Sequence, residues 1–162
     1  ETEKGRAEAE FWKERLLGLL STVETLVFLP NELEIGADRE NLAEVLSFIE
    51  EHIEPLGLSE KVRMQLELAA EEIFVNIASY AYAPKQGRAR IFVETDENEA
   101  VITFSDEGRP FDPTRKPDPT VSLSAEERTP GGLGIFLTKK LMDGISYEYR
   151  DGKNVLKLIK KV

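Results

Sequence analysis

The chain has 162 residues, of which 41% are hydrophobic and 32% charged, a composition typical of one globular domain with its own core. Asp and Glu total 31 against 21 Lys and Arg, which gives a formal net charge of −10. Since a general nucleic-acid binder needs a basic face for its phosphate contacts, this charge argues against that class.

Cysteine and histidine usage narrows the chemistry further. The sequence has no cysteine and one histidine, which excludes disulfides and thiol chemistry and disfavours a structural zinc site. No apolar run approaches membrane-spanning length, and no signal peptide is visible. We therefore expect a cytoplasmic protein that acts neither in a membrane nor directly on nucleic acid.

The first thirty residues predict one helix and one strand. Apolar residues at helical spacing, Trp12 and Leu16 among them, predict an amphipathic helix over 7–23. The run "TLVFLP" (25–30) has the composition of a strand and is stopped by its proline.

Two further helices are expected before the sequence changes character. One begins near the candidate N-cap Asp38 and ends at Pro55, and a longer one begins at the cap Ser59 and reaches about Tyr82. Their expected buried residues are Leu42, Val45, Leu46, Ile49 and Ile53 on the first of these helices and Val62, Leu66, Ala70, Ile73 and Ile77 on the second.

After Gly87 the sequence predicts strands. In chain order, we expect two strands at 88–95 and 99–105, an irregular loop at 106–131, a helix from 132, and two strands around the turn "DGK". Because hairpins dominate this order, it predicts an α+β two-layer sandwich, with a mostly antiparallel mixed sheet and helices on one face.

Three polar motifs lie on these elements. Glu72 and Asn76, four residues apart on the long helix, project the same way, so that a carboxylate base and an oxygen ligand for Mg²⁺ stand together. Taken alone, the pair is more typical of a solvated polar strip. "SDEGRPFDP" (105–113) follows a strand, and there Asp106 can accept a hydrogen bond from an amine such as that of adenine, while Gly108 permits close backbone approach.

The third motif is the glycine-rich helix start "TPGGLGIFL" (129–137). Backbone N–H groups and the positive end of the helix dipole can hold phosphate oxygens there. The motif is not a P-loop, because no Gly-Lys-Ser/Thr follows, and it is not the dinucleotide fingerprint, because a hairpin follows instead of a βαβ unit.

The order of these motifs resembles that of the GHKL ATPases, the superfamily of gyrase, histidine kinases and MutL. The helix with Glu72 and Asn76 resembles the N box, "DEGRPFD" the first glycine box and "GGLGIFL" the second. The proline-containing first box and the "GGLGIFL…LMD" run are most similar to the anti-sigma factor serine/threonine kinases of bacterial stress and sporulation pathways. The resemblance covers residues 24–162 and implies the ATP-binding fold of that superfamily, often called the Bergerat fold.

The resemblance also implies roles for single residues. Glu72 would be the catalytic base, Asn76 the Mg²⁺ ligand and Asp106 the adenine-binding carboxylate, with Gly108 beside it. Arg128, at the end of the loop that matches the ATP lid, would reach the terminal phosphate, although a solvated loop charge is an equal alternative. Phosphate contacts would come from the second box, at Gly132, Leu133 and Gly134. Many relatives carry a histidine where this chain has Tyr80, so the polar role of that histidine is in doubt here.

Three functions fit this resemblance. The first is an ATP- and Mg²⁺-dependent serine/threonine kinase that phosphorylates a small anti-sigma factor antagonist and binds a sigma factor. The second is the ATPase half of a histidine kinase or another larger signalling protein, although His52 lies too close to Asn76 to belong to a separate phosphoacceptor domain. The third is a non-catalytic, nucleotide-gated binding module, in which Glu72 would be merely structural.

The sequence leaves the roles of two segments undecided. Residues 1–23 lie outside the resemblance and would form a linker helix to an upstream domain, a homodimer contact or a helix packed on its own domain. Residues 112–130 combine Pro, Gly and charge with few apolar anchors, which predicts a lid that is mobile without a triphosphate.

Overall fold

The computed structural model describes residues 9–18, 30–115 and 132–162, and the chain divides into two units, Glu1–Pro30 and Asn31–Val162. In the first unit, residues 9–18 form a helix, within the span predicted for one. The strand predicted at 25–30 falls almost entirely outside the described residues. Among the described residues, no helix is both long and apolar enough to cross a membrane.

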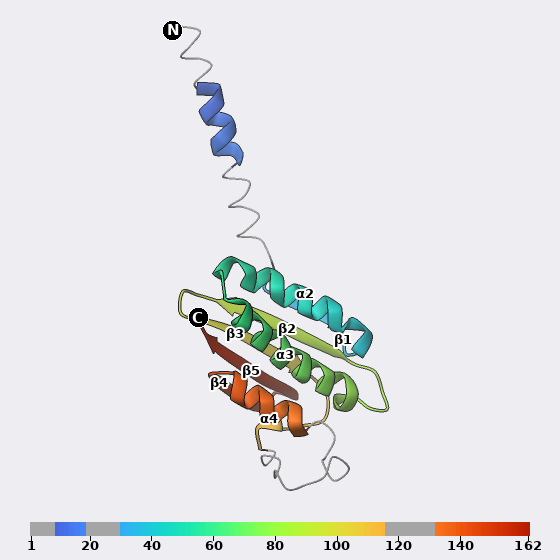
Figure 1. Ribbon diagram of the computed structural model, residues 1–162. Helices are drawn as coiled ribbons and strands as arrows, with labels where there is room; N and C mark the ends of the chain where they lie inside the picture. The colour runs from blue at the N-terminus through green and yellow to red at the C-terminus, as the bar shows by residue number, and fades with distance from the viewer. Residues whose placement is uncertain (1–8, 19–29, 116–131) are drawn as a thin grey trace. The chain divides into compact units, whose positions relative to one another are not determined.

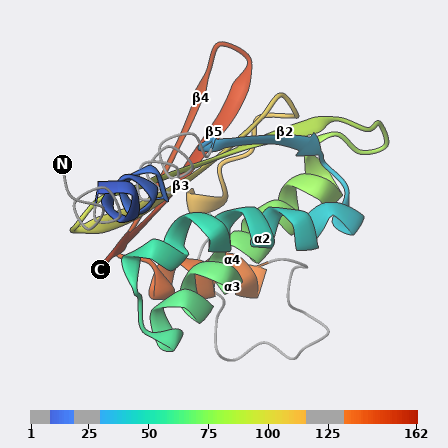
Figure 2. The same cartoon turned by 90° about the horizontal axis from the view of Figure 1, so that it is seen from above.

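The second unit is a two-layer sandwich of a sheet and helices (Figures 1 and 2). The sheet has the strand order β1-β2-β3-β5-β4, and all four pairings in this described sheet are antiparallel. Helices α2, α3 and α4 lie on one face of the sheet, as Figure 2 shows from above. The predicted α+β fold class is therefore confirmed. The elements are β1 (Glu32–Gly36), α2 (Leu42–Ile53), α3 (Glu60–Asn76), β2 (Arg88–Thr95), β3 (Glu99–Asp106), α4 (Gly132–Leu141), β4 (Gly144–Arg150) and β5 (Lys153–Lys161).

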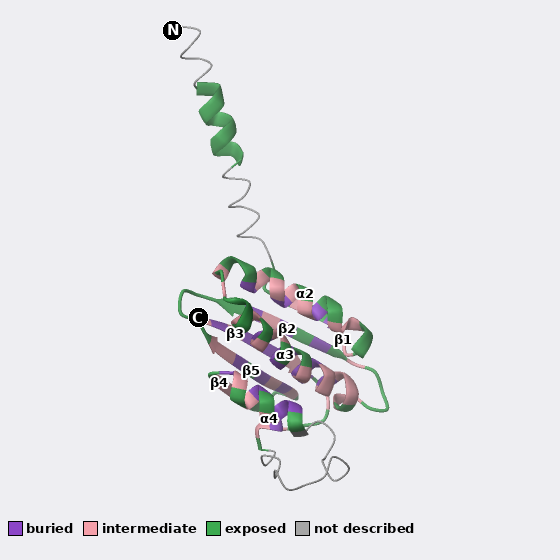
Figure 3. Cartoon of the chain, viewed as in Figure 1, coloured by how far each residue is buried: buried purple, intermediate pink, exposed green. Residues whose placement is uncertain are grey.

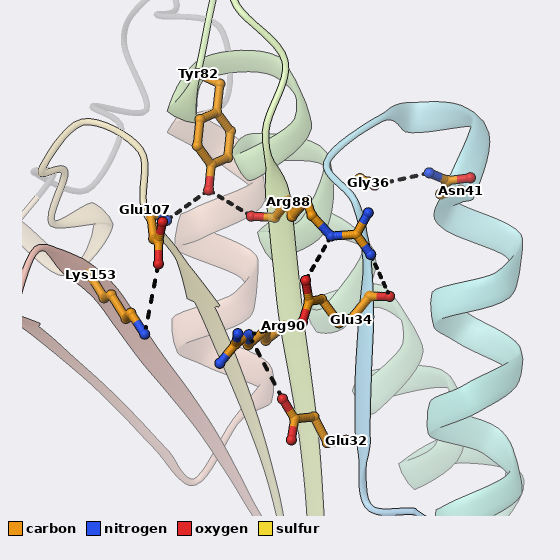
Figure 4. Close-up of polar contacts among 9 residues, drawn as sticks. All are labelled: Glu32, Glu34, Gly36, Asn41, Tyr82, Arg88, Arg90, Glu107 and Lys153. Atoms are coloured by element: carbon orange, nitrogen blue, oxygen red, sulfur yellow. Dashed lines mark hydrogen bonds and ion pairs between the residues drawn. The ribbon is translucent and has the colours of Figure 1, made fainter.

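Strand β1 follows Pro30 and was not predicted. Leu33 and Ile35 face the core, while Glu32 and Glu34 point to the open face of the sheet. There the two glutamates meet arginines of the antiparallel neighbour β2 (Figure 4), with Arg88 Nε 2.8 Å and Arg90 Nε 3.3 Å from the carboxylate of Glu34. Residues 32–35 alternate polar and apolar side chains as a strand does, but glutamate is depleted in strands, and here cross-strand ion pairs make its charge compatible with a sheet.

The helix boundaries follow the predicted caps. Ser59 Oγ accepts a hydrogen bond from Val62 N at 3.3 Å, and Asp38 Oδ1 accepts one from Glu40 N at 3.0 Å. Asp38 starts a short 3₁₀ turn before α2 rather than α2 itself. The long helix does not run unbroken to Tyr82, because α3 ends at Asn76 and continues as a π-helical turn, η3 (Ile77–Ala81). Such turns are often found at functional sites.

The core lies between the helices and the inner face of the sheet (Figure 3). Both helix faces predicted from periodicity contribute to it, with Val45, Ile49, Leu66 and Ala70 fully buried. The hairpin between β4 and β5 turns at Asp151 (φ 53°) and Gly152 (φ 76°), the left-handed pair that a two-residue hairpin favours.

Two leucines two positions apart on α3 test this core. Leu66 is 0% exposed and Leu68 is 51% exposed. We expect Leu66→Ala to lower the free energy of unfolding by about 2–5 kcal/mol, since it removes buried methyl groups and leaves a cavity. Leu68→Ala should change it by less than about 0.5 kcal/mol. Urea unfolding of both variants measures the difference, and equal losses would contradict the assigned face of α3.

Candidate functional site

A cavity of about 320 Å³ opens where α3 passes into η3, beside the ends of β3 and β5. Its size is at the lower end of the usual range for ligand pockets. Apolar and aromatic side chains form most of its wall, with a few polar groups between them. The lining residues are Ile73, Asn76, Ile77, Tyr80, Ala81, Phe104, Asp106, Arg109, Pro110, Phe111, Pro113, Tyr147, Asn154 and Leu156.

Asp106 is the last residue of β3 and is 6% exposed in the cavity wall. Its Oδ1 accepts hydrogen bonds from Gly108 N and from Asn154 Nδ2, each at 2.9 Å. Burial raises the pKa of the Asp106 carboxyl, and the two hydrogen bonds oppose that rise. In the described residues both bonds go to one oxygen, so Oδ2 is the acceptor left for a ligand.

Asn154 of β5 fixes this carboxylate and was missed by the sequence analysis. Its Nδ2 also donates to Arg109 O at 3.0 Å, and its Oδ1 accepts from Tyr147 Oη at 2.7 Å and from Phe111 N at 3.2 Å. The residue is 7% exposed, so its polar atoms are satisfied inside the protein. A signal existed in the strand "NVLKLIKKV", where an asparagine occupies an inward position in register with two leucines.

Asn76 ends α3 and lines the cavity, as the predicted metal ligand would. Its Nδ2 is buried without a hydrogen-bond partner in the described structure. A buried amide without a partner is costly in a protein that binds nothing there. Because the amide oxygen and nitrogen exchange places by a half-turn of the side chain, the same position can present Oδ1 to a cation.

Glu72 lies one turn before Asn76 on α3, outside the cavity lining. Gly134 of α4 packs directly on its carboxylate, so closely that a Cβ at this glycine would overlap the carboxyl group. Burial raises the pKa of Glu72, and the negative charge of Glu71 raises it further. The glycine at 134 therefore lets α4 approach the Glu72 carboxylate in its present position, in addition to any contact of its backbone with phosphate.

The remaining predicted residues are placed as follows. Gly132 is the first residue of α4, and Leu133 beside it is 48% exposed. Gly108 packs against Ala81 of η3 and is not among the residues that line the cavity, so its close approach is to protein backbone. Arg128 lies outside the described residues, as does most of the predicted lid.

Other lining residues were not among the site residues predicted from the sequence. Tyr80 and Ala81 reach the cavity because η3 winds more widely than an α-helix, and Arg109 Nη2 donates to Tyr80 O at 3.1 Å. Among the described residues, no cluster of three or more His, Cys, Asp or Glu side chains can hold a metal. A Mg²⁺ site here would therefore rest on Asn76 and on the phosphates of a ligand, the arrangement that this ion often adopts.

Comparison with known proteins identifies the class of this two-layer sandwich with its cavity at the ends of β3 and β5. Residues 35–160 match the family described as the histidine kinase-like ATPase domain. The match covers most of the chain. This protein therefore belongs to the histidine kinase-like ATPase domain family.

Similar proteins point to one branch of that family. The serine/threonine-protein kinase BtrW of Bordetella bronchiseptica is 34% identical over 62% of this chain and 71% of its own length. The serine-protein kinase RsbW of Listeria innocua is 30% identical over 62% of this chain and 67% of its own length. Both resemblances agree with the branch inferred from the glycine boxes.

A solved structure shares the fold. The crystal structure of the RsbU and RsbW domains of a Mycobacterium tuberculosis protein matches 80% of this chain with a TM-score of 0.52 and 14% identity. This chain spans about a third of that structure (32%). At this identity the match shows the fold alone.

The raised pKa of Asp106 predicts a pH dependence of stability. A carboxyl whose folded pKa exceeds its unfolded value stabilises the protein at low pH, and this contribution is lost as pH rises through the folded pKa. Asp106→Asn lacks that loss, so we expect the variant to gain stability relative to the parent as pH rises from about 4. Urea unfolding across the pH range measures the difference.

Asp143 is the matched control, because its hydrogen bond from Lys161 N lowers the pKa of its carboxyl. Asp143→Asn should therefore lose stability relative to the parent as pH rises toward about 4, below the range in which Asp106→Asn gains stability. Curves of the same sign for the two variants would show that the Asp106 carboxyl is not destabilised by burial.

Proposed function

We propose that this chain is an anti-sigma regulatory kinase that binds Mg²⁺·ATP in the cavity and phosphorylates a serine or threonine of a small antagonist protein. The observation that carries the proposal is the cavity itself, which joins a buried carboxylate, an unpartnered buried amide and apolar walls. The RsbW and BtrW relatives, both named as kinases, support the branch. A sigma factor is the second proposed partner, and a homodimer the proposed assembly.

The base of the nucleotide fits the cavity by its chemistry. An adenine ring is flat and apolar on both faces, and Phe104, Phe111 and Leu156 offer it such surfaces. Asp106 would accept a hydrogen bond from the exocyclic amine through Oδ2. Guanine carries a carbonyl oxygen at that place, which would repel the carboxylate, so the site should select adenine.

The phosphates would extend from the base toward Asn76 and the start of α4. Asn76 would hold Mg²⁺, which when bound supplies charge neutralisation for the transferred phosphoryl group. Backbone N–H groups at the first turn of α4, from Gly132 onward, would donate to phosphate oxygens. Leu133 and the lid residue Arg128 complete the proposed phosphate contacts.

Glu72 is the proposed catalytic base. Its carboxylate would take the proton of the acceptor hydroxyl as the hydroxyl oxygen forms a bond to the γ-phosphorus, while the bond between that phosphorus and the β–γ bridging oxygen breaks and ADP leaves. A raised pKa makes Glu72 a better proton acceptor than an ordinary glutamate. Its place one turn from Asn76 puts the base next to the proposed metal.

Separate variants test binding and transfer. Glu72→Gln keeps the shape of the side chain that packs on Gly134 but removes the base, so we expect transfer to fall by roughly 10²–10⁴-fold while ATP affinity stays near the parent value. Asn76→Ala should instead weaken binding of Mg²⁺·ATP. The measurements are calorimetry with an ATP analogue and transfer of labelled phosphate to candidate antagonist proteins from the same genome.

The outcomes distinguish the alternatives. Parental transfer rates in Glu72→Gln would remove Glu72 from the mechanism. Nucleotide binding by the parent with no transfer to any antagonist would favour the non-catalytic, nucleotide-gated binding module. Absence of nucleotide binding would remove the proposed function altogether.

The neighbouring charge of Glu71 predicts a shift in the pH–rate profile. Transfer should fall as pH drops through the raised pKa of Glu72, because the protonated carboxyl cannot accept the proton. Glu71→Gln removes one cause of the raised pKa, so the acidic limb should move to lower pH. Glu67→Gln, one turn earlier on the same helix, is the control and should leave the limb in place. Single-turnover transfer rates against pH measure both, and an unmoved limb in Glu71→Gln would contradict Glu72 as the titrating base.

A further inference from the structure

Tyr82 follows η3, and its hydroxyl connects the start of β2 with the residue after β3. Its ring lies beside the start of β2, and its hydroxyl lies between the backbones of Arg88 and Glu107 (Figure 4). Glu107 N donates to Tyr82 Oη at 2.7 Å, and Oη donates to Arg88 O at 2.6 Å. Since an amide N–H can only donate and a carbonyl can only accept, the direction of both bonds is fixed.

The hydroxyl sits where the ladder between β2 and β3 ends. The last pair of that ladder is Ala89 with Asp106, so Arg88 and Glu107 would form the next pair. Instead, Tyr82 Oη stands between the carbonyl of one and the amide of the other. The two strands can therefore part immediately after Asp106 without leaving these backbone groups unpaired.

The residues around the Tyr82 ring leave space for it in this position. A Cβ at Gly87 would overlap the ring of Tyr82, and the φ angle of Gly87 is not in the left-handed region, so the glycine is required for space. Burial raises the pKa of the Tyr82 hydroxyl, which keeps the proton that the bond to Arg88 O needs.

The turn after Asp106 is held from three sides. Ala81 O accepts a hydrogen bond from Arg109 N at 2.9 Å, and Asn154 Nδ2 donates to the carbonyl of the same residue. Tyr82 Oη holds the third side, at Glu107, the residue directly after the carboxylate. Tyr82 thus holds the residue that follows Asp106 in the chain, and Asn154 holds Asp106 itself from the neighbouring strand.

We propose that Tyr82 is a positioning residue for Asp106: by fixing the backbone of Glu107 at the parting of β2 and β3, its hydroxyl aims the Asp106 carboxylate at the exocyclic amine of the bound base. The inference rests on the proposed contact between Asp106 and adenine. Its consequence is that a side chain outside the cavity lining sets the preference for the base.

The test compares ADP with inosine diphosphate, which lacks the exocyclic amine, by calorimetry. Tyr82→Phe keeps the ring and loses the hydroxyl, so ADP should bind about three- to tenfold more weakly, the range given by one ordinary hydrogen bond, with inosine diphosphate nearly unchanged. Tyr149→Phe is the matched control, because Tyr149 is 47% exposed and outside the cavity lining. It should leave the ratio of the two affinities at the parent value.

A second variant protects the test against a folding defect. Gly87→Ala keeps the hydroxyl of Tyr82 but displaces its ring, so the ratio of the affinity for ADP to that for inosine diphosphate should fall in the same way. Because both changes act through one contact, the double variant Gly87→Ala with Tyr82→Phe should lose little more than either alone. Amide hydrogen exchange should become faster at Glu107 in Tyr82→Phe, while exchange in α2 stays unchanged.

The results distinguish an error in the role of Tyr82 from an error in the proposed adenine contact. If the parent binds ADP better than inosine diphosphate and Tyr82→Phe keeps that ratio, the positioning role of Tyr82 is overturned while the proposed function stands. If the parent binds both equally, or if Asp106→Asn leaves the ratio unchanged, the adenine contact itself is wrong, and the role of Tyr82 falls with it.

Discussion

The burial of one carboxylate, that of Asp106, is the constraint on which the rest of the site depends. A buried acid is destabilising unless hydrogen bonds compensate for its lost hydration. Here the compensation comes from Gly108 in the next turn and from Asn154 on a strand that is far away in sequence. Because one oxygen takes both bonds, the other oxygen of the carboxylate in the cavity wall is left for a ligand.

The same constraint explains features of the backbone around it. The chain must leave β3 directly after Asp106, and this departure needs partners for the backbone groups that the strands no longer pair. Ala81 in η3, Tyr82 directly after it and Asn154 in β5 supply these partners. The π-helical turn is part of this arrangement, since it contains Ala81 and leads directly into Tyr82.

A second close contact couples the helices to the proposed chemistry. Gly134 lets the start of α4 rest on the carboxylate of Glu72, so the proposed phosphate site and the proposed base meet at one glycine. Partial burial there raises the pKa of Glu72, as burial also does for Asp106. Binding and transfer would thus use two carboxylates whose properties depend on packing.

The sequence by itself determined the helix faces, the caps at Asp38 and Ser59, the hairpin and the three motifs, because periodicity, capping and turn preferences are local. It also determined the family, through motif order. Only the tertiary structure decided the position of β1, the break of the long helix at Asn76, and the roles of Asn154 and Gly134. Asn154 acts on Asp106 from 48 positions away, and the close packing at Gly134 exists only because Glu72 lies against it. Such contacts depend on which strands and helices become neighbours, and no local pattern encodes that.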